Sequence, residues 1–197
     1  MGMLILGLVL FLGVHSTRIV AEDWRTRQRA RLGENAWKGL YSVVSIAGFV
    51  LIIWGYGLAR QQPVVLWTPL PSFVKHIASL LTLLAFVLLV AAYVPRNSIK
   101  AKLHHPMVLG VKSWAFAHLV SNHTLADLLL FGGLLVWAAL SFRAARQRDK
   151  ALGTVYPSGT LVGTLLTVLI GVALWVGFAL WAHGAWIGIE PFARAAR

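Results

Sequence analysis

The sequence contains no cysteine and little charge, and both shortages restrict what the protein can be. Without cysteine, the 197-residue chain can form no disulfide, thiolate metal site, cysteine-ligated iron–sulfur cluster or covalently attached c-type haem. Only 12% of the residues are charged, whereas 58% are hydrophobic and the mean hydropathy is +0.75. That composition leaves too little polar surface for a soluble globule, so we expect an integral membrane protein.

Acidic residues are particularly scarce, with 6 Asp and Glu against 18 Lys and Arg, which gives a formal net charge of +12. Such an excess can serve nucleic-acid binding, but here the basic residues are divided among short loops and form no single face. In a chain this apolar, membrane topology is the ordinary explanation. We therefore expect a lipid bilayer as the partner and no nucleic acid.

Six apolar runs are separated by polar loops, and a bilayer core needs about 20 apolar residues to be crossed. The runs cover residues 1–17, 37–58, 72–94, 106–120, 125–142 and 161–182. The fourth run is short and spans only roughly 22 Å as a helix. The first lacks the basic start and cleavage site of a signal peptide, so we expect it to be retained. The sequence predicts one all-α transmembrane domain over residues 1–197, a bundle of about six helices.

The basic residues are distributed unequally between the two sets of alternating loops. The loops after the first, third and fifth runs, with their near flanks, hold 14 of the 18, namely Arg18, Arg25, Arg27, Arg29, Arg31, Lys38, Arg96, Lys100, Lys102, Lys112, Arg143, Arg146, Arg148 and Lys150. The positive-inside rule places these loops in the cytoplasm and both termini outside. Residues 22–35 suit a solvated loop or a short surface helix, and residues 143–150 are expected to form a charged loop.

Two histidines fall inside apolar runs at depths that can match. His15 lies one turn before Arg18, and His118 lies about 9 Å beyond Lys112 along its helix. An ionisable side chain in hydrocarbon is costly without a partner or ligand, so each is a functional-site hypothesis by default. The plainer alternative is that each imidazole bonds a backbone carbonyl or a serine on a neighbouring helix.

Zinc and a proton relay both fit these histidines poorly. Zinc takes three or four protein ligands, and the chain offers no such set near His15. A proton relay uses Asp or Glu within the helices, and only Asp127 is close. Thr124 and Asp127 have the spacing of a capping box, which explains Asp127 as a structural residue.

Haem b fits better, because it needs one or two histidines, apolar aromatic walls and basic residues near its propionates. The candidate walls are Phe11, Trp114, Phe116 and Trp37. The candidate partners of the propionates are Arg18, Lys38 and Lys112. From the residues alone, a haem b between the first and fourth helices, with His15 and His118 as candidate ligands, stays open beside the plainer alternative of two hydrogen-bonded histidines.

The other histidines lie nearer helix ends. We expect His76, His123 and His183 to be dispensable for a cofactor, since polar residues favour the outer ends of membrane helices. His105 is the nearest competitor as a ligand. Its plainer role is to precede Pro106 at the start of a helix, where proline is favoured.

Six segments together closely resemble the NnrU family of bacterial membrane proteins, and the resemblance covers nearly the whole chain. The segments are residues 11–16, 37–42, 92–95, 105–110, 114–122 and 153–157. The resemblance implies a multi-pass protein of the bacterial inner membrane that is associated with denitrification, through the cell's ability to reduce nitrite and nitric oxide.

The NnrU family also looks related to the plant zeta-carotene isomerase, a membrane haem b enzyme. Two motifs of that enzyme supply haem-ligating histidines, and they correspond by position to His15 and His118 of this sequence. The isomerase has a cysteine as an alternative ligand in the second motif, where this chain has Ala115. The resemblance thus implies ligation of the haem by two histidines. Because this chain has no cysteine at that position, its iron cannot exchange a histidine ligand for a thiolate.

Several functions stay open at this point. The leading one is a haem b protein that supports nitrite and nitric oxide reduction, with a membrane reductase as its partner. A haem-dependent cis–trans isomerase would act on a polyene or isoprenoid lipid and would need an open iron position. A haem-free assembly factor would need neither histidine. The segment from His104 to Gly110 also resembles part of the motif of isoprenylcysteine-type methyltransferases, without its arginine, tyrosine and paired glutamates.

Overall fold

The computed structural model describes residues 1–68, 70–71 and 73–192, and its helices follow the apolar runs. Within these residues, five helices are long and apolar enough to cross a membrane, as expected of a multi-pass membrane protein. The predicted fourth span is the 16-residue helix α6, Pro106–Ser121, which extends only about 24 Å. A count of six spans and the N-out, C-out orientation stay predictions.

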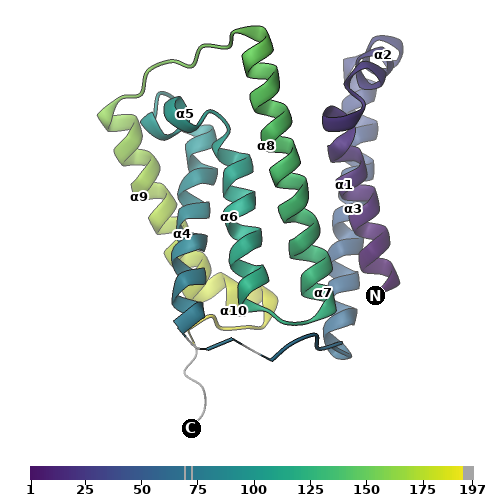
Figure 1. Cartoon of the computed structure of the whole chain (residues 1–197), viewed down its shortest axis with the longest axis vertical. Coiled ribbons are helices and arrows are strands. Elements are labelled where there is room, and N and C mark those ends of the chain that lie inside the picture. Colours follow the sequence, from purple (N-terminus) through teal and green to yellow (C-terminus); the bar gives the residue numbers. More distant parts are fainter. Residues whose placement is uncertain (69, 72, 193–197) are drawn as a thin grey trace. The chain divides into compact units, whose positions relative to one another are not determined.

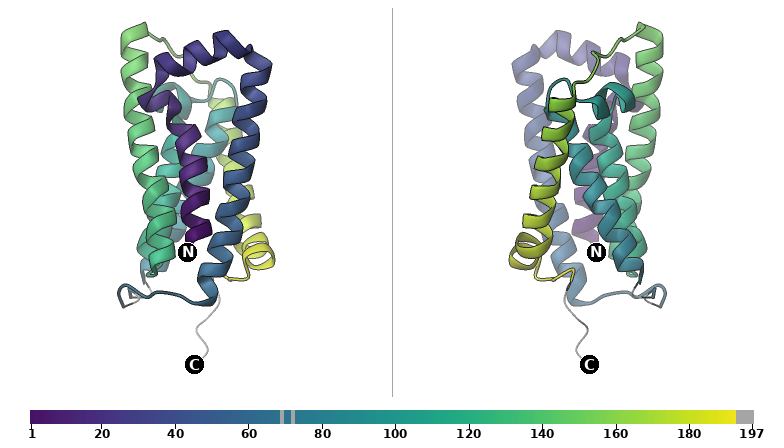
Figure 2. Two further views of the ribbon diagram at one scale, coloured as in Figure 1. Left: turned by 90° about the vertical axis from the view of Figure 1, so that its right-hand side faces the viewer. Right: turned by 90° about the vertical axis from the view of Figure 1, so that its left-hand side faces the viewer.

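The chain divides into two compact units, which are described separately. Unit 1 comprises Met1–Pro69 and Asn122–Arg146. Its elements are α1 (Gly2–Val20), α2 (Glu22–Leu32), α3 (Glu34–Gln61), α7 (Leu125–Asp127), the π-helical segment η1 (Leu128–Gly132) and α8 (Gly133–Leu152) as far as Arg146. The helices α1 and α3 pack side by side, and α2 runs across their ends (Figure 2).

Glycines set the distance between α1 and α3. A Cβ added to Gly7 would lie 2.6 Å from the backbone nitrogen of Ile52, and one added to Gly48 would lie 2.7 Å from that of Phe11. A Cβ on Gly55 would meet the backbone of Leu4. The two backbones therefore touch directly, as small residues allow between membrane helices.

Unit 2 comprises Leu70–Ser121 and Gln147–Arg197. Its elements are α4 (Phe73–Tyr93), α5 (Ser98–Leu103), α6, the end of α8, α9 (Leu161–Gly177), the π-helical segment η2 (Phe178–Ala182) and α10 (His183–Ile187). The helix α4 packs against both α6 and α9 (Figure 1). Gly110 of α6 and Gly171 of α9 provide the close approach, since a Cβ on either would lie within 3.0 Å of α4.

Two predicted loops are wrong in part. Residues 143–150 continue α8, which ends only at Leu152, before Gly153 with its φ of +61°. Residues 98–103, inside the basic loop expected after the third run, form α5. Residues 22–35 take the surface-helix option, with α2 ending before Gly33. Ser72, the first residue of the third predicted run, lies outside the described residues, as do Arg194 and Arg197, two of the four basic residues assigned to the other side of the membrane.

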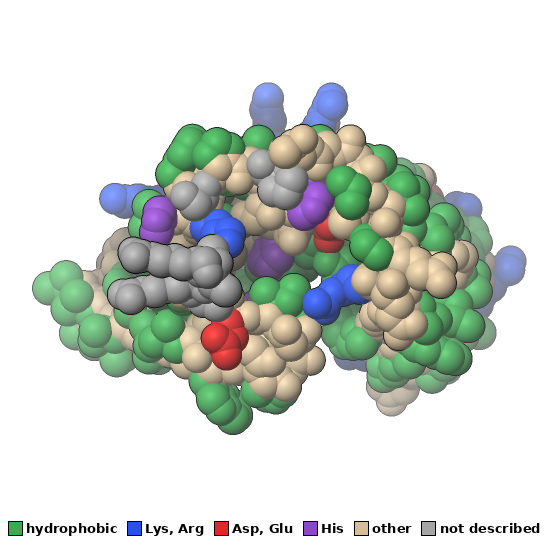
Figure 3. Space-filling model, turned by 90° about the horizontal axis from the view of Figure 1, so that it is seen from below, with side chains coloured by type: hydrophobic (Ala, Val, Ile, Leu, Met, Phe, Trp, Pro, Cys, Tyr) green, Lys and Arg blue, Asp and Glu red, His purple; other side chains and the backbone are tan. Residues whose placement is uncertain are grey.

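Large apolar side chains remain exposed along the spans, as lipid contact requires. Val9, Val43, Leu80 and Leu169 are 63–68% exposed. Figure 3 shows such apolar side chains, in green, over large parts of the surface seen from one end of the helices. In water this much exposed apolar surface would favour aggregation, whereas in a bilayer it faces acyl chains.

Candidate functional site

The His15 imidazole is held by its own helix. Its Nδ1 lies 2.7 Å from the carbonyl oxygen of Phe11, one turn earlier in α1. The Phe11 ring stacks on the imidazole with ring centroids 4.1 Å apart and an interplanar angle of 28°. One residue four positions before the histidine thus supplies both a hydrogen-bond acceptor and an apolar wall.

His118 of unit 2 repeats this arrangement on α6. Its Nδ1 lies 2.9 Å from the carbonyl oxygen of Trp114, and the Trp114 ring lies 4.8 Å from the imidazole. Both histidines are half-buried. The same local design therefore occurs in each unit, with an aromatic residue four positions before the histidine.

These contacts select one tautomer of each neutral imidazole. A carbonyl oxygen only accepts hydrogen bonds, so Nδ1 must carry the hydrogen and Nε2 the lone pair. An Nδ1–H bound to a backbone carbonyl is the usual support of a histidine that ligates a metal through Nε2. The plainer alternative, a bond to a backbone carbonyl, is thus what the structure shows, although the carbonyl belongs to the histidine's own helix. A neutral imidazole with its hydrogen on Nδ1 has its lone pair on Nε2, the form in which a histidine ligates a metal.

Unit 1 places two further aromatic rings at His15. Tyr41 of α3 lies 5.2 Å from the imidazole, and Trp137 of α8 lies 6.0 Å away with its ring edge-on at 86°. The indole nitrogen of Trp137 is buried and has no hydrogen-bond acceptor among the described residues. Neither ring was predictable from the sequence, because the contact of each with α1 depends on tertiary packing.

Two aromatic residues proposed as haem walls lie in other surroundings. Trp37 packs edge-on against Trp24 of α2, with ring centroids 5.9 Å apart. Phe116 is 46% exposed, although it lies only two residues before His118 in the sequence. Phe11 and Trp114 are the two predicted walls that contact the histidines.

The basic residues proposed as partners of the propionates are exposed side chains. The Lys38 ammonium lies 2.8 Å from the Glu34 carboxylate, four residues earlier in α3. Arg18 and Lys112 are exposed at their positions on α1 and α6. Lys38 therefore already has an anionic partner from its own chain.

Asp127 has the structural role expected of it. Its Oδ2 accepts hydrogen bonds from the backbone nitrogen and the hydroxyl of Thr124, which completes the predicted capping box. Its Oδ1 accepts a 2.6 Å hydrogen bond from the hydroxyl of Tyr56 on α3. This carboxylate is 5% exposed and both of its oxygens are occupied, so it is explained without a catalytic role.

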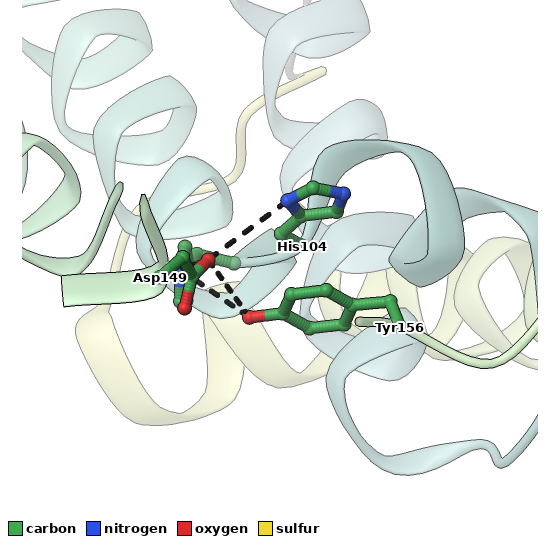
Figure 4. Close-up of polar contacts among 4 residues, drawn as sticks. His104, Asp149 and Tyr156 are labelled. Carbon is green, nitrogen blue, oxygen red and sulfur yellow. Dashed lines mark hydrogen bonds and ion pairs between the residues drawn. The ribbon is translucent and has the colours of Figure 1, made fainter. Parts of the chain in front are cut away.

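Unit 2 contains a second polar group, which we call the corner cluster and which comprises His104, His105, Asp149 and Tyr156. The Asp149 carboxylate oxygen Oδ2 accepts hydrogen bonds from His105 Nε2 at 2.7 Å and from the Tyr156 hydroxyl at 3.1 Å. His104 stacks on the Tyr156 ring, with centroids 4.2 Å apart and an angle of 8°. Figure 4 shows the side chains of His104 and Tyr156 pointing toward Asp149.

The backbone at the corner cluster is strained. His104 has φ +67° and ψ −49°, and the His105 nitrogen donates to the Leu103 carbonyl at 2.8 Å. These values describe a γ-turn of the rare positive-φ kind, which a residue with a side chain adopts only when its surroundings enforce it. The stack on Tyr156 and the bonds to Asp149 provide that enforcement.

Within the described residues, no group of three or more His, Cys, Asp or Glu is arranged to hold a metal ion. Haem iron needs only one or two protein ligands, because the porphyrin supplies the other four. Asp149 was not singled out from the sequence, where its only signal was a charge in a presumed loop. Tyr156 entered only as part of the 153–157 segment that resembles the family, with no role of its own.

Comparison with known proteins identifies the family. No curated protein and no solved structure matches the chain. A family model described as NnrU protein matches residues 3–191, which is nearly the whole sequence. The matched region contains His15, His118 and the corner cluster. The chain belongs to the NnrU family.

Proposed function

We propose that this NnrU-family protein is a membrane haem b protein that supports the reduction of nitrite and nitric oxide. His15 and His118 would be the residues that hold its iron. The protein works in the bacterial inner membrane beside a membrane reductase. The association of NnrU proteins with nitrite and nitric oxide reduction supplies the process, and the two histidines supply the chemistry.

The observation that carries the proposal is the repeated support of the two imidazoles. Each has Nδ1–H on a carbonyl four residues earlier and an aromatic ring from that same residue. Neutral imidazole nitrogens in apolar, aromatic surroundings are the donor set that haem b takes. The residues present therefore fit this group.

The chain itself would hold the haem and exclude water from its surroundings. When bound, haem b supplies one-electron redox chemistry at its iron. The carbonyls of Phe11 and Trp114 fix the orientation of the two imidazoles and raise their basicity as ligands. The surrounding Phe11, Tyr41 and Trp137 rings lower the local polarity at His15, and solvent exclusion is one of the main controls of a haem potential.

The absorption spectrum of the purified protein, oxidised and then reduced with dithionite, tests the proposal. We expect a six-coordinate, low-spin haem b spectrum, which His15→Ala and His118→Ala abolish or convert while leaving the protein folded. His76→Ala, at an exposed histidine of α4, is the matched control and should change nothing.

Other outcomes identify other functions. A five-coordinate spectrum that shifts when a polyene or isoprenoid lipid is added would favour a haem-dependent isomerase. A protein without haem that still restores nitrite reduction to cells lacking it would be an assembly factor. Loss of haem in His105→Ala alone would move the ligand to the corner cluster.

A further inference from the structure

The indole nitrogen of Trp137 poses a hydrogen-bonding problem that the described residues do not solve. It is buried and has no acceptor among them. A polar group buried without a partner costs roughly 1–3 kcal/mol, and in a membrane no bulk water is available to it. Such a group calls for a specific explanation, and an absent partner is a leading one.

Trp175 of α9 shows the ordinary solution in the same chain. Its indole nitrogen donates to the Thr82 hydroxyl on α4 at 3.0 Å. Both tryptophans are half-buried, but the indole N–H of Trp175 has a hydrogen-bond acceptor in the protein and that of Trp137 has none among the described residues. The pair provides a matched comparison.

The position of Trp137 indicates what its partner is. Its ring lies edge-on to His15, 6.0 Å between centroids, within the same unit. His15 is the histidine that the proposed function assigns to the haem iron. The unsatisfied donor therefore lies beside the imidazole where a bound cofactor is expected.

Haem b offers few acceptors to such a donor. Its four pyrrole nitrogens bind iron, and two axial histidines leave no site for a further iron ligand. The remaining acceptors are the carboxylate oxygens of its two propionates. We infer that Trp137 donates its Nε1–H to a propionate of the haem ligated by His15, an inference that rests on the proposed function.

This hydrogen bond would help to bind a propionate, a role for which the sequence suggested only basic residues. Lys38, one of the expected partners of the propionates, is already paired with Glu34 at 2.8 Å. A neutral N–H can bind a carboxylate without adding a buried positive charge, and a hydrogen bond to an ionised acceptor is stronger than a neutral one. Trp137 is thus a cofactor-binding residue that fixes the orientation of the porphyrin.

The test uses the full-length protein produced without haem in detergent and loaded with haem b or with its dimethyl ester, whose propionates carry no charge. Loss of each haem to excess apomyoglobin gives a dissociation rate. We expect Trp137→Phe to lose haem b about tenfold faster than the wild type, the usual effect of one charge-assisted hydrogen bond. With the dimethyl ester, wild type and Trp137→Phe should dissociate at similar rates.

The controls separate the possible failures. Trp175→Phe makes the same substitution at the satisfied indole and should leave both dissociation rates unchanged. Equal acceleration with both haems in Trp137→Phe would reduce Trp137 to a packing role, and no acceleration would show that its N–H is not used. Either result overturns the inference and leaves the proposed function standing, whereas a wild-type protein that binds neither haem overturns both.

Discussion

Two pairs of histidines in this chain satisfy their hydrogen bonds in opposite ways. His15 and His118 use carbonyls of their own helices, four residues earlier. His104 and His105 instead depend on Asp149 and Tyr156, and Asp149 lies 44 residues beyond His105. The hydrogen bonds of the first pair require only that a helix forms. The contacts of the second pair require that unit 2 is folded and that the strained turn at His104 is in place.

The difference indicates separate roles. A histidine supported by its own helix keeps its orientation while Nε2 serves a ligand, so the support and the function do not compete. In the corner cluster, the nitrogen of His105 that meets Asp149 is itself Nε2, and the bond ties the start of α6 to the end of α8. The proposed function therefore concerns the first pair, whereas the contacts of the second pair stabilise unit 2.

The strongest prediction concerns removal of each imidazole. His15→Gly or His118→Gly should weaken haem binding by more than about a hundredfold, since changes outside the ligand sphere alone cost about 10- to 100-fold. Added imidazole should enter the space left behind and restore the low-spin spectrum. His105→Gly should keep the spectrum without imidazole, and its loss there would reverse the two roles.

The second prediction establishes on which side of the membrane the corner cluster lies. The protein has no cysteine, so a single introduced thiol reports sidedness without background. Val155→Cys, at an 88% exposed position beside Tyr156, should react with a membrane-impermeant maleimide only in inside-out vesicles. Gln62→Cys, just after α3, should react in intact cells, and the opposite pattern would invert the predicted orientation.

The third prediction concerns the Tyr156 hydroxyl. Tyr156→Phe keeps the stack on His104 but removes the 3.1 Å hydrogen bond to Asp149, so it should lower stability by about 0.5–1.5 kcal/mol. Thermal unfolding in detergent measures this change, and the haem spectrum should not move. Tyr93→Phe, at a 75% exposed ring of α4, is the matched control and should be neutral. A change of the haem spectrum in Tyr156→Phe would mean that the corner cluster affects the cofactor and is not only a stabilising contact.

The smallest expected effect comes from the strained turn. Both His104→Ala and His104→Gly lose the stack on Tyr156, but only glycine adopts a φ of +67° without steric cost. The glycine variant should therefore be more stable than the alanine variant by about 1 kcal/mol. At His76, inside α4, the same two substitutions should rank in the reverse order, because glycine weakens a helix by about 1 kcal/mol. Equal stabilities at position 104 would mean that the turn stores no strain.

The contrast between the pairs also explains what could be predicted from the sequence. Helical spacing made the apolar runs and the capping box at Asp127 foreseeable, because each depends on residues close together in the sequence. The partners of His105 and the position of Trp137 depend on contacts between distant segments. No local pattern encodes those contacts.

The end of α8 was mispredicted for a different reason. Arg143, Arg146 and Lys150 follow one another at spacings of three and four, which suits one face of a solvated helix as well as it suits a loop. Composition alone does not separate the two. The left-handed Gly153 gives the better signal for the end of the helix.

The glycine contacts between α1 and α3 bear on how the protein is made. Both helices leave the ribosome before α8 does, and Gly7, Gly48 and Gly55 let their backbones meet without help from later segments. Domains form in the order of synthesis, so this hairpin can assemble in the bilayer while α8 is still being translated. His15 would then already lie beside Tyr41 when Trp137 is synthesised, and the aromatic surroundings of His15 would be completed only after His118 has been synthesised.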